Sequence, residues 1–317
     1  MKIIVRRLIL SLPLLFAITV ISFFLMHLAP GDPSTILIDP KIRPEDMLKI
    51  KHNLGLDKPI ILQYFYWLKA LFQGNLGFSL VNGKSVLVSI VERLPATLIL
   101  SLASLILTLI FSFFLGLISA YKKGSFFDQV MVIVCFLGLA IPSFWLGIIL
   151  ILFFSLQLNL LPSSGFIDPY LTNVSLIEQI FNLLGHLILP LITISVASIA
   201  SLTLYNRFQV LNILNQDYII AARARGLKES RILFKHAFKN AALPLVTLLG
   251  LELPGLIGGA FIIEYIFAWP GMGQLGIQSI FARDYPVLMG ILLFSAILII
   301  IGNFLADFCY QLVDPRI

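Results

Sequence analysis

The chain has 317 residues, only 12% of which are charged, and its mean hydropathy is +1.00. Because soluble proteins carry roughly 25% charged residues, this composition excludes an ordinary soluble protein and indicates a membrane protein. The net charge of +6 gives no support to nucleic-acid binding, which uses a basic face on a soluble fold.

Continuous apolar runs define the predicted architecture, since about 20 helical residues cross the ~30 Å hydrocarbon core. We expect six transmembrane helices, over residues 8–29, 94–121, 130–158, 187–206, 241–263 and 287–308. The first run follows Lys2, Arg6 and Arg7 as in a signal peptide, but it lacks a small-x-small cleavage pattern, so we expect a retained helix. The predicted class is therefore an all-α polytopic membrane protein.

Residues 30–93 are expected to form an external amphipathic segment between the first two helices. Residues 44–55 begin with proline and two acids, as helices often do, and residues 59–73 combine apolar and aromatic positions that suit the headgroup interface. We predict two short helices here, lying along the outer face as a lid or vestibule.

Two features of the apolar runs bear on their conformation. Pro142 removes a backbone hydrogen bond and is expected to kink the third helix, either as a hinge or as a static bend. Cys135 and Cys309 both lie in predicted spans, so no disulfide framework is implied.

Lysine and arginine positions predict the orientation, because short cytoplasmic loops hold the excess. The N-terminus, the loop after the second run and residues 207–240 carry twelve basic residues, whereas residues 159–186 and 264–286 carry only Arg283. Residues 30–93 carry eight, but loops beyond about 60 residues cross regardless of charge. We expect both termini in the cytoplasm.

Residues 207–240 form the largest predicted cytoplasmic piece. Asn215 or Asp217 can cap a helix, Gly226 supplies a left-handed stop, and KESRILFKHAFKN resumes a helix. The segment is therefore expected to hold two short helices joined by a glycine turn.

Small and basic residues alternate around this turn. Ala221 and Ala222 would let a helix lie close against another surface, and Arg223, Arg225 and Lys228 would meet acidic or carbonyl groups there. The alternative is that the basic residues anchor the loop at anionic headgroups.

Two glycine-rich stretches resemble nucleotide-binding motifs, but neither meets the requirements of its motif. Residues 77–85 have five residues between the glycines where a phosphate-binding loop needs four, and GMGQLG at residues 271–276 does not lie between a strand and a helix. The sequence has no His-Glu-x-x-His or Gly-x-Ser-x-Gly motif, and its four histidines show no metal-ligand spacing. We expect no enzyme, metal or cofactor on this chain.

The basic segment resembles the coupling motif of ABC importer permeases, Glu-Ala-Ala-x-x-x-Gly followed downstream by Leu-Pro. Ala221, Ala222 and Gly226 match this motif, and Leu-Pro at residues 243–244 closes it. Ile220 stands where the general motif has Glu, and the Leu-Pro comes later; both departures resemble the peptide and nickel branch.

The resemblance to the dipeptide, oligopeptide and nickel permease family covers essentially the whole chain. Its other motifs are, in order, GDP, NLGLDKPIILQY, ERLPATL, IPSFWLG, GGAFIIEYIFAWPGMG, RDYP and LVDPRI. The resemblance implies the type I ABC importer permease fold, with residues 1–317 as a single transmembrane permease domain and residues 207–240 as its cytoplasmic coupling loop.

The resemblance further implies half of a translocation pathway for short peptides across the bacterial inner membrane, or alternatively for nickel or a nickel chelate. It implies a second permease, two cytoplasmic ATPase subunits that hold ATP and Mg²⁺, and an external substrate-binding protein. The rival from another class is a self-contained secondary transporter; such proteins are commonly built from repeats, and no repeat relates residues 1–158 to residues 159–317.

Two groups of site residues follow. The ATPase-coupling residues implied by the motif are Asp217, Ala221, Ala222, Arg223, Arg225, Gly226, Leu227, Lys228 and Glu229. A carboxylate at mid-membrane depth is costly, so Glu252 either lines the pathway or pairs with a polar group of the neighbouring permease. The pathway candidates are Glu252, Gly255, Gly258 and Gly259, of which the glycines either form a narrow gate or allow close helix packing.

Overall fold

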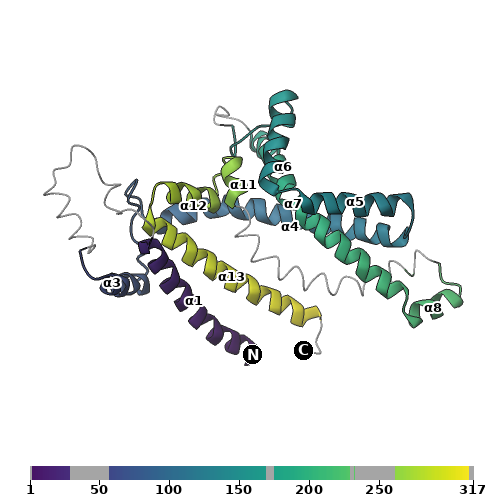
Figure 1. The fold of residues 1–317 in the computed structure, drawn as a ribbon, viewed down its shortest axis with the longest axis horizontal. Coiled ribbons are helices and arrows are strands. Elements are labelled where there is room, and N and C mark those ends of the chain that lie inside the picture. The colour runs from purple at the N-terminus through teal and green to yellow at the C-terminus, as the bar shows by residue number, and fades with distance from the viewer. Residues whose placement is uncertain (1, 29–56, 169–174, 229–231, 233–260, 314–317) are drawn as a thin grey trace. The chain divides into compact units, whose positions relative to one another are not determined.

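The computed structural model describes residues 2–28, 57–168, 175–228, 232 and 261–313 (Figure 1). Across these ranges the regular structure is helical apart from an isolated bridge between Phe78 and Ser85. The chain forms two compact units. The first comprises Met1–Thr97 with Pro270–Phe304, and the second comprises Leu98–Trp269 with Leu305–Ile317.

Among the described residues, four helices are long and apolar enough to cross a membrane. They are Leu10–Leu28 within α1 (Lys2–Leu28), α4 (Val86–Tyr121), α7 (Leu176–Leu214) and Tyr285–Phe304 within α13 (Tyr285–Val313). A bent pair, α5 (Phe126–Ala140) followed by α6 (Ser143–Leu150) and the π-helix η2 (Ile151–Gln157), could supply a fifth span. The chain is thus a multi-pass membrane protein.

The predicted count of six spans stays a prediction. Five of the predicted runs fall on these helices, but the run 241–263 lies outside the described residues except for its last three, which begin α11 (Phe261–Ile266). The predicted external helix over residues 44–55 also lies outside them. The predicted helix at residues 59–73 is confirmed as α3 (Ile60–Phe72).

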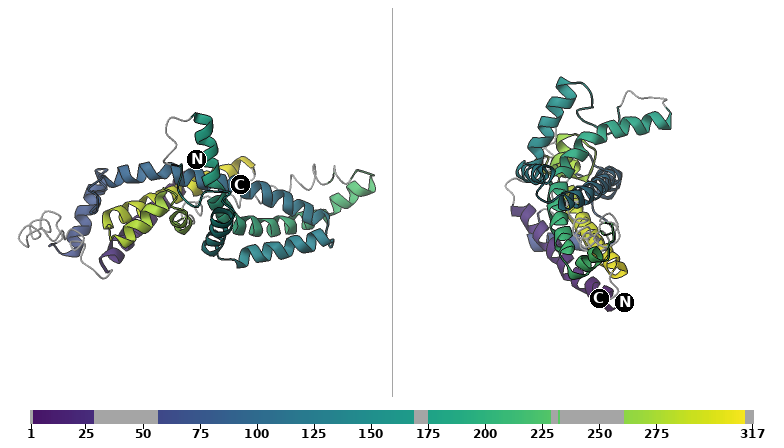
Figure 2. Two further views of the ribbon diagram at one scale, coloured as in Figure 1. Left: turned by 90° about the horizontal axis from the view of Figure 1, so that it is seen from above. Right: turned by 90° about the vertical axis from the view of Figure 1, so that its right-hand side faces the viewer.

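The predicted kink at Pro142 is confirmed (Figure 2). The bend between α5 and the α6–η2 segment is sharp, at 100°. Ile141 adopts φ −80° and ψ 122°, the extended conformation that a following proline favours. Helical geometry therefore stops at Ala140 and restarts at Ser143.

Two helices are longer than their apolar runs. α4 begins at Val86 rather than 94, and α7 covers Leu176–Leu214 rather than 187–206. At the start of α7, Ser175 and Glu178 form a capping box, which fixes the helix end well before the apolar run. At 1.5 Å per residue α7 is about 58 Å long, so it extends beyond a ~30 Å hydrocarbon core.

In the first unit, α3 packs on the C-terminal half of α1. The Tyr64 hydroxyl lies 3.0 Å from that of Thr19, and the Tyr64 ring meets Phe23 edge-on at 5.3 Å. At the start of α13, the buried carboxylate of Asp284 accepts hydrogen bonds from the Ser79 hydroxyl and the Leu80 amide. These contacts hold α3 and residues 79–80 to two candidate spans.

In the second unit, α7 is the central helix and packs against α5, α6 and α11. Small residues also allow α4 to approach α7 closely, as is common between membrane helices. A Cβ atom added at Gly116 of α4 would lie 2.9 Å from both the Asn206 Cβ atom and the Thr203 carbonyl oxygen of α7. The Ser104 and Ser195 hydroxyls, 3.0 Å apart, add a hydrogen bond between the same two helices.

Gly116→Ala tests this packing, because the new methyl group meets backbone that cannot move aside. We expect a loss of about 1–3 kcal/mol in stability, as for other overpacked interiors. Gly185→Ala is the matched control, since Pro162, at 3.8 Å, is the one described residue that its Cβ atom would meet. Thermal unfolding of both variants in one detergent measures the difference; equal melting temperatures would contradict the close approach.

Candidate functional site

A short helix, α8 (Asp217–Ala224), follows the end of α7 as a separate element (Figure 1). The prediction that Asn215 or Asp217 caps it is wrong: Asn215 ends α7, and the N-cap is Gln216, which makes no side-chain cap hydrogen bond. Asp217 is instead the first helical residue, where its carboxylate interacts favourably with the positive end of the helix dipole.

The predicted stop at Gly226 is confirmed, with φ +76°. The Gly226 amide donates to the Arg223 carbonyl at 2.9 Å, and the Leu227 amide donates to the Ala222 carbonyl at 3.3 Å. This pair of bonds is the Schellman motif, which requires a left-handed residue after the helix and therefore favours glycine. The turn fixes where the chain leaves α8.

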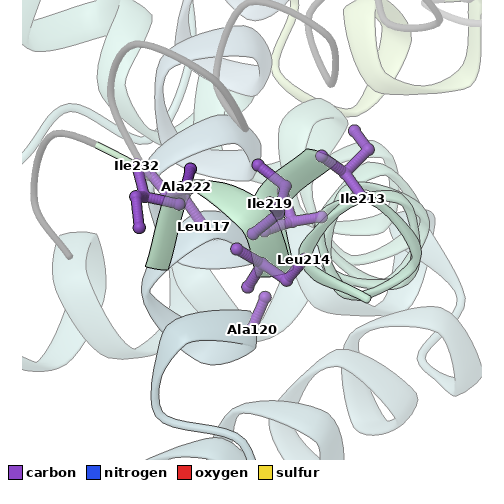
Figure 3. Packing of buried hydrophobic residues seen from close by; sticks show 8 residues of the cluster. Leu117, Ala120, Ile213, Leu214, Ile219, Ala222 and Ile232 are labelled. Atoms are coloured by element: carbon purple, nitrogen blue, oxygen red, sulfur yellow. The ribbon is translucent and has the colours of Figure 1, made fainter. Parts of the chain in front are cut away.

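The underside of α8 lies on a buried apolar cluster (Figure 3). Ile219 is fully buried and Ala222 nearly so. The other buried members come from the ends of α4 and α7 and from one residue beyond α8: Leu117, Ala120, Val210, Ile213, Leu214 and Ile232. Because α8 packs on these helix ends, it is part of the second unit.

The opposite side of α8 is exposed. Tyr218 and Ile220 expose 41% and 54% of their surface. The basic side chains of Arg223, Arg225 and Lys228 are exposed around them. The Arg223 guanidinium also lies 3.5 Å from the Leu214 carbonyl oxygen at the end of α7. The surface therefore combines apolar area with positive charge.

A partly buried ion pair lies close to the helix ends that support α8. Arg207 of α7 binds Asp128 of α5 through two parallel bonds, Nε to Oδ1 at 2.6 Å and Nη2 to Oδ2 at 2.7 Å. Asp128 is 3% exposed. Sequence reasoning counted Arg207 only as a basic loop residue and did not single out Asp128; an acid in the first turn of an apolar helix was the available signal.

The predicted coupling residues fall on α8 and its turn, except Glu229, which lies outside the described residues. Within that set, Asp217, Arg223, Arg225, Gly226 and Lys228 are exposed, Ala221 and Leu227 are half-buried, and Ala222 is turned into the cluster. The pathway candidates Glu252, Gly255, Gly258 and Gly259 all lie outside the described residues.

Comparison with known families gives two matches. Residues 112–317 match the family described as binding-protein-dependent transport system inner membrane component. Residues 1–103 match the N-terminal domain of the same class of membrane component. Together the two matches cover almost the whole chain.

Individual relatives match along their full length. The chain is 45% identical to the oligopeptide transport system permease protein AppB of Bacillus subtilis, over 99% of this chain and 98% of the relative. It is 38% identical to the di/tripeptide transport system permease protein DppB of Pseudomonas aeruginosa, with the same coverage of both chains. It is 39% identical to a putative peptide permease protein of Brucella ovis, over 98% and 97%.

One solved structure shares the fold. The inward-facing MetNI methionine ABC transporter matches with a TM-score of 0.56 at 18% identity, over 72% of this chain and 97% of that chain. This likeness supports the fold alone.

Ile219→Ala is expected to loosen α8, because it removes a fully buried side chain from the cluster at a cost of about 2–5 kcal/mol. Ile220→Ala is the matched control, since the neighbouring side chain is exposed. Hydrogen exchange of the amides in residues 217–228 should accelerate in the first variant and stay unchanged in the second. Equal protection in both variants would contradict the seating of α8.

Proposed function

The chain belongs to the family of binding-protein-dependent transport system inner membrane components, and we propose that it forms half of an ATP-driven import pathway for short peptides. As a member it is a permease subunit of an ABC importer, a multi-pass protein of the inner membrane. Cargo, partner subunits and the orientation of the termini are the parts that we propose.

Peptides are the cargo that the relatives favour. Relatives at 45% and 38% identity, matched over nearly their whole length, are named for oligopeptide and di/tripeptide transport. Nickel, the alternative that the sequence left open, is not favoured by these relatives. We therefore assign peptide rather than nickel cargo.

A permease of this family works in a complex, and we propose four partner subunits of three kinds. They are a second permease, a pair of cytoplasmic ATPase subunits carrying ATP and Mg²⁺, and an external binding protein. We propose that the N-terminus and α8 both lie on the cytoplasmic side, because both carry basic residues and short cytoplasmic loops hold the excess of these residues. ATP hydrolysis then takes place on the partners, and this chain responds to it.

α8 is the proposed docking element for an ATPase subunit. Its exposed Tyr218 and Ile220 offer apolar contact, and Arg223, Arg225 and Lys228 offer charge to an acidic or carbonyl-lined cleft. Its buried side is packed on α4 and α7, so a push on α8 acts on two candidate spans. This packing is the observation that carries the proposal, because it connects the exposed side of α8 to two candidate membrane helices.

Uptake by the reconstituted complex tests the proposed function. Proteoliposomes holding the purified complex should import labelled di- and oligopeptides only when ATP and the binding protein are supplied. Uptake of nickel ions instead of peptides would contradict the assignment of peptides as the cargo. Transport by this chain alone without ATP would support a secondary transporter.

Gly226→Asp tests the docking surface. Among the described residues, the added Cβ atom meets nothing within 4 Å. The new carboxylate therefore lies beside the exposed basic residues and weakens their positive field. We expect peptide uptake per ATP hydrolysed to fall at least about fivefold, the lower end of typical coupling energies. Gly226→Asn is the control, because asparagine shares the shape and also tolerates positive φ. Normal uptake by the aspartate variant would count against docking at α8.

A further inference from the structure

Asp128 is the centre of a buried polar cluster that joins three helices of the second unit. Besides the two bonds from Arg207 of α7, its carboxylate accepts hydrogen bonds from the Ser119 hydroxyl of α4 and from the Gly124 amide. Each carboxylate oxygen thus accepts two hydrogen bonds. A bidentate guanidinium contact fixes orientation as well as distance, which apolar packing does not.

Asn206, the neighbour of Arg207, holds α7 to α4. Its side-chain amide donates to the Phe113 carbonyl at 3.1 Å and to the Ser112 carbonyl at 3.4 Å. Gly116 lets the two backbones approach at this level. Two consecutive residues of α7 therefore bind two different helices, Asn206 binding α4 and Arg207 binding α5.

α5 depends on this pair for its polar attachment. Its buried residues are Asp128, Cys135 and Gly138. A Cβ atom at Gly138 would lie 3.3 Å from side-chain carbons of Ala200 and Val196 of α7, so this glycine marks a close approach between the two helices. Within α5, the directional hold on α7 thus comes from Asp128.

The same helical turns contribute residues to the apolar cluster on which α8 packs. Ser119 lies between Leu117 and Ala120 of the buried cluster, and Val210 follows Arg207 by one turn. A displacement of α8 acts first on these turns. The ion pair lies at the contact between these turns and α5, so a movement of α4 and α7 would move α5 through it.

We propose that the Asp128–Arg207 pair is a positioning element, which makes α4, α5 and α7 follow α8 as one body and so transmits ATPase motion to the bent helix α5–α6. This inference rests on the proposed function. It assigns to two residues of this chain a role in the yield of transport per ATP, without contact to substrate or nucleotide.

The test uses the full complex in proteoliposomes and measures peptide imported per ATP hydrolysed. Arg207→Lys keeps the charge but replaces two parallel bonds by a point contact. Asp128→Asn with Arg207→Gln removes both charges and leaves none buried without a partner. We expect both variants to assemble and hydrolyse ATP, with peptide imported per ATP reduced at least about fivefold.

A merely structural role predicts a different pattern. The doubly neutral variant would then give wild-type yield, because ion pairs inside proteins are often replaceable at little cost. Lys84→Gln with Glu92→Gln removes an exposed ion pair of the first unit and is the matched control, with wild-type yield expected. Wild-type yield in Arg207→Lys or in the doubly neutral variant would overturn the inference.

The wild-type complex separates the two proposals. Absence of ATP-dependent peptide uptake in wild type would overturn the proposed function itself. Normal wild-type uptake with unchanged yield in the Arg207 variants would overturn only the positioning role.

Discussion

Ile219 has no exposed surface because α8 lies directly on the last turns of α4 and α7. Hydrophobic burial of this kind holds the short helix in place, although eight residues are too few to be a stable helix alone. The left-handed turn at Gly226 then directs the chain away from the cluster. The exposed side of α8 therefore belongs to an element that is packed directly on α4 and α7.

Polar contacts add direction to this packing. In a membrane protein the apolar surroundings give little driving force between helices, so small residues and interhelical hydrogen bonds decide which faces meet. Gly116, Asn206 and the Asp128–Arg207 pair lie within a few turns of one another on three helices. Directional polar contacts thus join the helices at the end of the unit beside α8, while the bend after Ala140 lies at the other end of α5.

Sequence reasoning predicted the features that have local causes. Apolar runs, the break at Pro142 and the stop at Gly226 each depend on a few neighbouring residues, and the structure confirms the break and the stop. Helix ends were missed where caps extend a helix past its apolar run, as Ser175 does for α7. The Asp128–Arg207 pair could not be predicted, because its members are 79 residues apart and only tertiary packing brings them together. Which alanine of α8 faces inward also depends on that packing.

A cross-link from α8 tests the central claim most directly. A photoreactive amino acid at Ile220 in the intact transporter should cross-link to an ATPase subunit, because this side chain is exposed on the proposed docking surface. The same group at Ile61, which is exposed on α3, should give no such product, because we propose that α3 lies on the external side. Cross-linking of position 220 to the external binding protein, or no ATPase product at all, would contradict the claim that α8 is the element on which the motor acts.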